Sequence, residues 1–180
     1  MKYVEYGQQI PVRIEVLNGK NSRLTRYFFC GNPSIDDYFR LEALDDSTAV
    51  TYLVIDEMNE KLLAALTISC SAIFLSKKLQ FSTLMSAIEV VYYAVDVDYQ
   101  GLPYRPGDQR SLSHYLFSYL IEMMRDISRE HVGAAKIVLY SVPEAKNFYT
   151  RLGFKTFDRN MYGDRGTYVS DCKPMYFDLN

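Results

Sequence analysis

The run AIEVVYYAVDVDYQG, residues 87–101, decides the fold. Almost every side chain from 87 to 95 is bulky or β-branched, which is typical of a strand covered on both faces. The character changes at Gln100 and Gly101, and a strong helical pattern begins at Leu112 and ends near Gly133. Its apolar stripe is formed by Leu112, Leu116, Tyr119, Met123 and Ile127 and is broadened by Tyr115, Leu120 and Met124. A buried strand that leads through a loop into an amphipathic helix predicts an α/β architecture.

The flanking segments extend this architecture in both directions. Residues 48–57 and 61–74 predict an antiparallel hairpin around the turn Met58 to Glu60, and residues 75–86 form a polar connection. Residues 11–19 alternate like a strand, and 31–46 predict a short helix with Asn32 or Ser34 as its cap. Strands over 134–140 and 167–180 enclose a helix over 141–155, with a capping box at Ser141 and Glu144 and a stop at Gly153. We therefore predict one domain, residues 1–180, with a mixed twisted sheet flanked by helices.

Composition limits the classes of function. The chain has 180 residues, 48% of them hydrophobic, and a net charge of −2, so no global basic field favours nucleic acid. Its odd number of cysteines, Cys30, Cys70 and Cys172, indicates a reducing cytoplasm, and we expect Cys70 to be a buried apolar residue. The longest apolar run is too short and too interrupted for membrane insertion.

Several other chemistries lack their motifs. His114 and His131 lie on the same predicted helix, with no further ligands at metal-binding spacing, so no metal site is expected. The sequence also has no Walker loop and no nucleophile elbow.

The second half of the chain resembles the GNAT superfamily of acetyl-CoA-dependent N-acetyltransferases. The family's Ala-x-x-Phe-Tyr-x-x-x-Gly-Phe pattern is matched in full by Ala145, Phe148, Tyr149, Gly153 and Phe154. The N-terminal run FFCGNPSIDDYFRLEALDD, residues 28–46, is more loosely similar to GNAT toxins that acetylate aminoacyl-tRNA. The resemblance implies a GNAT-like fold and acetyl-CoA as the acyl donor.

The family holds the cofactor pyrophosphate with a Gln/Arg-x-x-Gly-x-Gly/Ala loop, and this loop is altered here. Residues 102–109 read as an insertion, and serines replace both later glycines. The start and end of the loop are matched by Gln100, Gly101, Arg110, Ser111, Leu112 and Ser113. Backbone N–H groups at a helix start still attract anions, and serine is a good cap residue, so we expect cofactor binding here. Arg105 and Arg110 could add positive charge.

The resemblance also implies contacts for the rest of the cofactor. Backbone N–H groups near Ala94, Val95 and Val97 correspond to the family's contacts with the thioester and pantetheine arm. Asn147 is a weaker candidate for a cofactor contact.

Two side chains are candidates for proton transfer. Glu89 resembles the general base of the histone-acetyltransferase branch, and apolar neighbours on its strand face could raise its pKa toward a useful value. Tyr149 matches the family's usual general acid toward the departing thiolate. The simpler alternative for Glu89 is a carboxylate that lies near the exposed strand end or is paired with a lysine, and for Tyr149 it is a core tyrosine.

The sequence therefore predicts an N-acetyltransferase that moves an acetyl group from acetyl-CoA to the primary amine of an unidentified acceptor. One alternative is toxin-like acetylation of aminoacyl-tRNA, with tRNA and an antitoxin as partners. Another is a non-catalytic member of the fold that binds CoA or a protein partner. A homodimer is left open.

Overall fold

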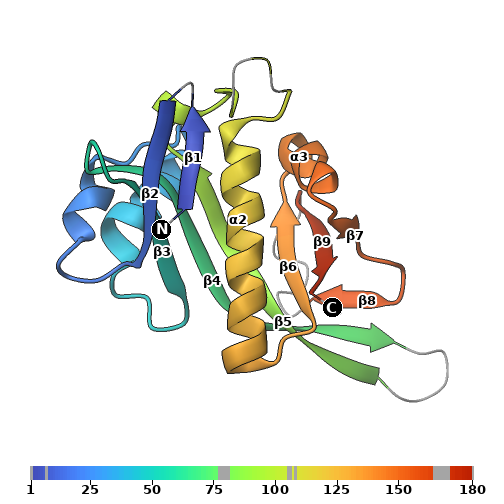
Figure 1. The fold of residues 1–180 in the computed structure, drawn as a ribbon. Helices are drawn as coiled ribbons and strands as arrows, with labels where there is room; N and C mark the ends of the chain where they lie inside the picture. The colour runs from blue at the N-terminus through green and yellow to red at the C-terminus, as the bar shows by residue number, and fades with distance from the viewer. Residues whose placement is uncertain are drawn as a thin grey trace. The chain divides into compact units, whose positions relative to one another are not determined.

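A computed structural model describes residues 2–6, 8–76, 82–104, 107, 109–163 and 171–179 (Figure 1). They form two compact units: Met1–Ile68 with Tyr92–Leu120, and Ser69–Val91 with Ile121–Asn180. Strands β4 (Lys61–Ser76) and β5 (Ser82–Val95) and helix α2 (Leu112–Ile127) each contribute residues to both units. The single domain over residues 1–180 stays a prediction.

The first unit begins with antiparallel strands. Strands β1 (Lys2–Tyr6), β2 (Gln8–Val16), β3 (Val50–Asp56) and the first part of β4 pair in chain order. The β3–β4 turn is fixed by Asp56, whose buried carboxylate accepts hydrogen bonds from the N–H groups of Met58 and Asn59. This confirms the predicted hairpin around Met58 to Glu60.

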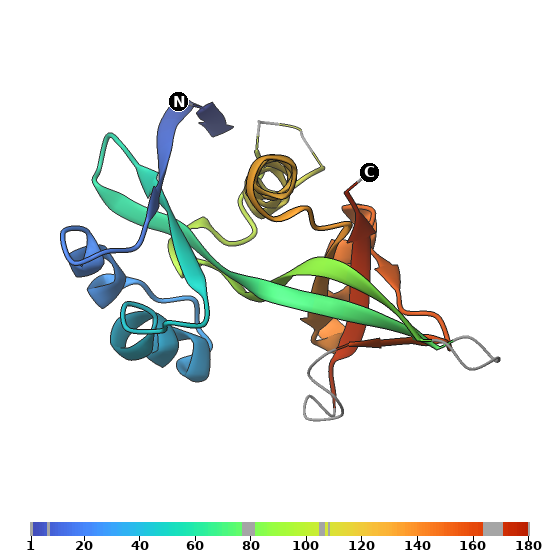
Figure 2. The same ribbon diagram turned by 90° about the horizontal axis from the view of Figure 1, so that it is seen from below.

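Helices flank the strands of the first unit. The short helices η1 (Ser22–Tyr27), α1 (Pro33–Asp37) and η2 (Tyr38–Glu42) lie on one side, and the first half of α2 lies on the other (Figure 2). Asn32 caps α1 by accepting hydrogen bonds from the amides of Ser34 and Ile35, as expected from the sequence. One apolar cluster joins these short helices to the strands, and it includes Phe28, Tyr38, Phe39, Leu53, Ile55 and Ala94.

The second unit contains the parallel strand pair. Strand β5 pairs in parallel with β6 (Lys136–Ser141), with Glu89 opposite Val138, and β6 pairs antiparallel with β9 (Lys173–Asp178). Strand β7 (Lys155–Thr156) pairs with β9, and β8 (Met161–Gly163) pairs with β4. The parallel and antiparallel pairs together make the mixed sheet that the sequence predicts.

The helices of the second unit end where the sequence predicts. Helix α2 continues through the π turn η4 (Ser128–Val132) and ends at Gly133, whose φ of 61° is left-handed. The turn η5 (Pro143–Ala145) leads into α3 (Lys146–Arg151), and Gly153 follows with φ of 93°. A side chain at Gly153 would also meet the ring of Phe177 at 3.3 Å, so both the backbone conformation and the packing favour glycine.

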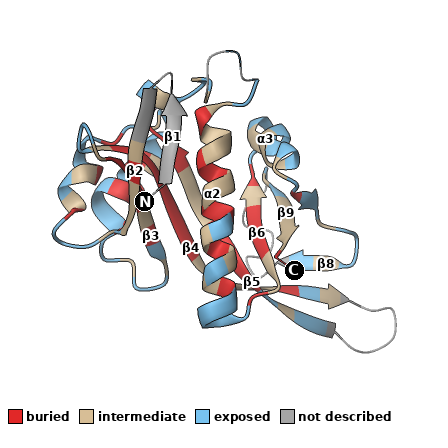
Figure 3. Ribbon diagram, viewed as in Figure 1, coloured by how far each residue is buried: buried red, intermediate tan, exposed pale blue. Residues whose placement is uncertain are grey.

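The buried stripe of α2 lies slightly off its predicted position (Figure 3). Leu112 and Leu116 are buried as expected, but Leu120 and Met124 continue the stripe, whereas Tyr119 and Met123 are half-buried. The stripe therefore follows the residues that were expected only to broaden it.

Three local predictions are wrong. The 75–86 connection is shorter than expected, since 75–76 belong to β4 and 82–86 to β5. The capping box does not form, because Ser141 ends β6 and its hydroxyl donates to the carbonyl of Val142. Cys70 is exposed, although Ile68 and Ile73 on either side of it in β4 are buried. Of the predicted strand over 167–180, residues 167–170 and 180 lie outside the described part.

Candidate cofactor and catalytic site

The loop after β5 folds back on itself before α2 begins. The turn η3 (Val97–Tyr99) leads to Gly101, whose φ of 70° is the left-handed conformation that favours glycine. Pro103 and Ser111 then form an antiparallel bridge, and the amide of Leu112 donates to the carbonyl of Leu102 at 2.7 Å. The described part of the insertion therefore returns the chain to the start of α2. Arg105 lies outside the described residues.

Ser111 is the N-cap of α2. Its hydroxyl oxygen accepts a hydrogen bond from the amide of His114 at 3.3 Å, which is the usual contact of a capping serine. The amides of Leu112 and His114 are thus engaged within the protein, and the contact of Leu112 with the cofactor stays a prediction. Among the described residues, no acceptor is found for the amides of Gly101 and Ser113.

Gln100 has a different role from the expected cofactor contact. Its side-chain Nε2 donates to the carbonyls of Val95 at 2.7 Å and Cys30 at 2.8 Å. The side chain therefore ties the end of β5 to a segment far away in the sequence. The amide of Val97 is engaged in the same way, because it donates to the carbonyl of Phe29 at 2.9 Å. The amide of Val97 is thus engaged within the protein, and Ala94 and Val95 are buried at the strand end. Their contacts with the cofactor stay predictions.

Asp96 organises the same strand end, and the sequence analysis missed it. Its buried carboxylate accepts hydrogen bonds from the amides of Asp98 at 3.1 Å and Phe29 at 3.4 Å. Lys61 lies 3.3 Å from Asp96 and makes a second ion pair with Asp98. The only sequence signal was the Asp-x-Asp spacing directly after the buried strand.

Two aromatic contacts fix the first turns of α2. The hydroxyl of Tyr93 donates to the carbonyl of Ser113 at 3.0 Å, and its ring packs edge-on against Phe117. The exposed Arg110 lies over the ring of Tyr115 at 4.5 Å, and Tyr115 stacks on Tyr104. Arg110 is therefore held beside the helix start, where its charge favours an anion.

Tyr149 and its motif partners lie in the second unit. The ring of Tyr149 packs edge-on against Phe148 and Phe154, with centroids 5.1 and 5.8 Å away. Burial raises the pKa of Tyr149 to about 12, so its hydroxyl is protonated at neutral pH. A protonated hydroxyl can serve as a proton donor but not as a base.

Glu89 and Asn147 also lie in the second unit, in contrasting surroundings. Glu89 is only 3% exposed and sits within the parallel pairing of β5 with β6, so it is not a surface carboxylate at a strand end. Asn147 is exposed near the start of α3. The first unit thus holds the candidate phosphate loop, and the second holds both candidate proton-transfer groups.

The residues that the structure describes contain neither a metal-binding cluster nor a membrane-spanning helix. No group of three or more His, Cys, Asp or Glu side chains there is arranged to hold a metal ion. No helix in that part of the chain is long and apolar enough to cross a membrane.

The GNAT fold is defined by three features together: a mixed sheet, a strand that leads through a glycine loop into a capped helix, and a following strand–helix pair. No protein-family model matches the sequence, and no curated protein matches it. Solved structures do match. One, described as a bacterial toxin, is 21% identical with a TM-score of 0.70, and the match covers 94% of this chain and 91% of the toxin.

Two named toxins are similar over nearly their whole length. A Tyr-to-Phe mutant of KacT is 16% identical with a TM-score of 0.68, covering 93% of this chain and 95% of KacT. AtaT complexed with acetyl-methionyl-tRNAfMet is also 16% identical, with a TM-score of 0.66 and the same coverage of each chain. These matches show that the chain has the fold of GNAT toxins, which confirms the expected fold and the toxin likeness.

Proposed function

We propose that this protein is an acetyl-CoA-dependent N-acetyltransferase whose acceptor is the α-amino group of an aminoacyl-tRNA. The observation that carries the proposal is the helix start after β5, where the amides of Gly101 and Ser113 have no acceptor among the described residues. A helix N-terminus with available amides attracts phosphate, and Arg110 adds positive charge beside it. Bound acetyl-CoA would supply the thioester from which the acetyl group is transferred.

The two candidate groups of the second unit fit the two proton transfers. Attack by the amine forms a bond between nitrogen and the acetyl carbon, and the carbon–sulfur bond then breaks. Glu89 would accept the proton released from the amine, as a carboxylate in a buried setting can. Tyr149 would donate its hydroxyl proton to the departing thiolate, and the pKa of about 12 means that the hydroxyl carries this proton at neutral pH.

The fold neighbours support aminoacyl-tRNA as the acceptor. AtaT has been solved with acetyl-methionyl-tRNAfMet, and in other structures with the C-terminus of its antitoxin AtaR and acetyl-CoA. The N-terminal resemblance at residues 28–46 points to the same group of enzymes. The net charge of −2 opposes an RNA substrate only weakly, because RNA binding depends on local basic patches more than on net charge.

The test is acetylation by the purified protein with labelled acetyl-CoA. We expect the label on aminoacyl-tRNA, with none on deacylated tRNA of the same sequence. We also expect expression in bacteria to arrest growth, and Tyr149→Phe to relieve the arrest. Acetylation of small amines alone would retain the enzyme class but exclude the tRNA acceptor.

One observation favours a non-catalytic alternative. The amides of Leu112 and His114 are engaged within the protein, which leaves fewer donors for a pyrophosphate than an open glycine loop would. Binding of acetyl-CoA without turnover on any aminoacyl-tRNA or amine would favour this alternative.

A further inference from the structure

The first unit contains a pocket that the acetyl-transfer site does not use. It has a volume of about 470 Å³ and lies between η1 and the β3–β4 turn. Leu24, the buried Phe28 and the buried Leu62 give it an apolar floor. Tyr27 stands at its edge with 83% of its surface exposed, which is the largest value among the big apolar side chains of the described ranges. An exposed aromatic ring beside an apolar floor is suited to a planar ligand.

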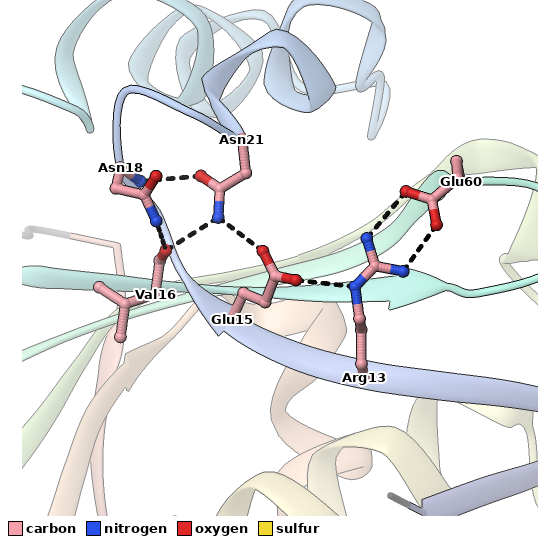
Figure 4. A network of polar contacts seen from close by, with 6 residues as sticks. All are labelled: Arg13, Glu15, Val16, Asn18, Asn21 and Glu60. Atoms are coloured by element: carbon pink, nitrogen blue, oxygen red, sulfur yellow. Dashed lines mark hydrogen bonds and ion pairs between the residues drawn. The ribbon is translucent and has the colours of Figure 1, made fainter.

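The acidic groups near this pocket are already neutralised. The guanidinium of Arg13 binds both carboxylate oxygens of Glu60 at 2.8 Å, and it also binds Glu15 (Figure 4). Lys61 is held by Asp96 and Asp98. These pairs leave no unpaired carboxylate on the pocket lining.

The basic side chains of the same segment make no ion pair with any described residue. Lys20, Arg23 and Arg26 are exposed, and no ion pair joins any of them to another residue in the part of the chain that the structure describes. Arg23 lines the pocket itself. The surface around Tyr27 therefore presents unpaired positive charge beside an aromatic ring, which is a combination typical of sites for single-stranded nucleic acid.

The backbone connects this pocket to the proposed cofactor loop within the same unit. The carbonyls of Phe29 and Cys30, directly after the pocket residue Phe28, accept hydrogen bonds from the amide of Val97 and the side chain of Gln100. A ligand seated against Tyr27 and Phe28 thus contacts the segment that is bonded to the end of β5.

We infer that this pocket binds an unpaired nucleobase from the single-stranded acceptor end of the substrate RNA, with Tyr27 stacking on the base and Arg23 binding an adjacent phosphate. The inference rests on the proposed function. A nucleotide matches the site because it joins a planar ring to an anion, and the pocket offers an exposed aromatic ring at Tyr27 beside the cation of Arg23.

The test is a direct binding measurement with a short, fluorescently labelled single-stranded RNA that ends in CCA. Base stacking on an aromatic side chain is worth enough that Tyr27→Ala should weaken binding about 5- to 150-fold. Arg23→Gln should weaken binding and lower its salt-dependence slope by about one. The matched controls Tyr162→Ala and Arg159→Gln change exposed residues of the second unit and should leave binding unchanged.

Each variant is first checked by thermal unfolding and by acetyl-CoA binding, neither of which should change. If the protein acetylates aminoacyl-tRNA but both pocket variants bind the RNA like the parent, the pocket inference is overturned and the proposed function stands. If the protein acetylates no tRNA but the pocket variants lose RNA binding, the pocket is a site for a single-stranded nucleobase as inferred, and only the proposed acceptor is wrong. Equal loss in the control variants, or capture of a peptide partner in place of RNA, also overturns it.

Discussion

At the scale of single residues, Tyr149 offers the sharpest test of mechanism. Tyr149→Phe keeps the ring that packs on Phe148 and Phe154 and removes only the hydroxyl. Since general acid catalysis is typically worth about 10²- to 10⁴-fold, we expect turnover to fall by that factor while acetyl-CoA affinity stays nearly constant. Steady-state kinetics and calorimetric titration measure the two quantities, with Tyr162→Phe as an exposed control. Near-full turnover by the folded variant would remove Tyr149 from the mechanism.

Gln100 provides a second test, because its side chain joins the end of β5 to the segment at Cys30 by hydrogen bonds. Gln100→Leu leaves the carbonyls of Val95 and Cys30 without their donor. At about 0.5–1.5 kcal/mol for each hydrogen bond, the free energy of unfolding should fall by about 1–3 kcal/mol. Acetyl-CoA binding should also weaken, since the tie positions the loop. Denaturant unfolding of Gln100→Leu and of the exposed control Gln109→Leu checks this, and equal stability would contradict the tie.

Sequence patterns predicted some residue roles but not those of Gln100 and Asp96. The turn at Gly153 and the cap at Asn32 were predictable because both depend on neighbours in sequence. The partner of Gln100 is Cys30, and that of Asp96 is Lys61, so each contact depends on the folded chain. The exposure of Cys70 was missed because an apolar run does not tell which of its side chains are covered.

At the scale of elements, the start of α2 carries the cofactor hypothesis. Ser111→Gly removes the cap to His114 at a cost of only a few tenths of a kcal/mol, so acetyl-CoA affinity should stay unchanged or rise. Ser111→Glu should weaken affinity, because it places a negative charge beside the pyrophosphate. Calorimetric titration distinguishes the three proteins. Identical affinities would mean that the phosphates bind elsewhere.

The helices and strands were predicted more reliably than the contacts of single residues. The β3–β4 hairpin and strand β6 follow from apolar runs between turn residues, and α2 follows from its spacing and its end at Gly133. The failed capping box shows the limit of this reasoning. The Ser141 and Glu144 spacing was correct, but β6 extends through Ser141, so strand pairing overrides the local signal.

At the scale of the whole molecule, acetyl-CoA should stabilise the fold. A ligand that binds only the folded state at 100 times its dissociation constant adds about 2.7 kcal/mol. For a chain of this size, that free energy raises the unfolding midpoint by about 5–10 °C. A thermal scan with acetyl-CoA and with free adenine as control measures the shift. No shift at millimolar acetyl-CoA would contradict cofactor binding.

The division of the chain between two units has a consequence for shortened gene products. A premature stop after Leu120 would leave every residue of the first unit but remove β6, the parallel partner of Ala87 to Val90 in β5. These four residues are at most 5% exposed in the intact protein, and without β6 their backbone groups and apolar side chains would form an open edge. We expect the fragment to form insoluble aggregates in light-scattering and sedimentation measurements, where a soluble monomer would contradict this reasoning. The first 120 residues of such a protein can then not be inherited as a separate gene, so natural variation should alter its loops and keep this part joined to β6.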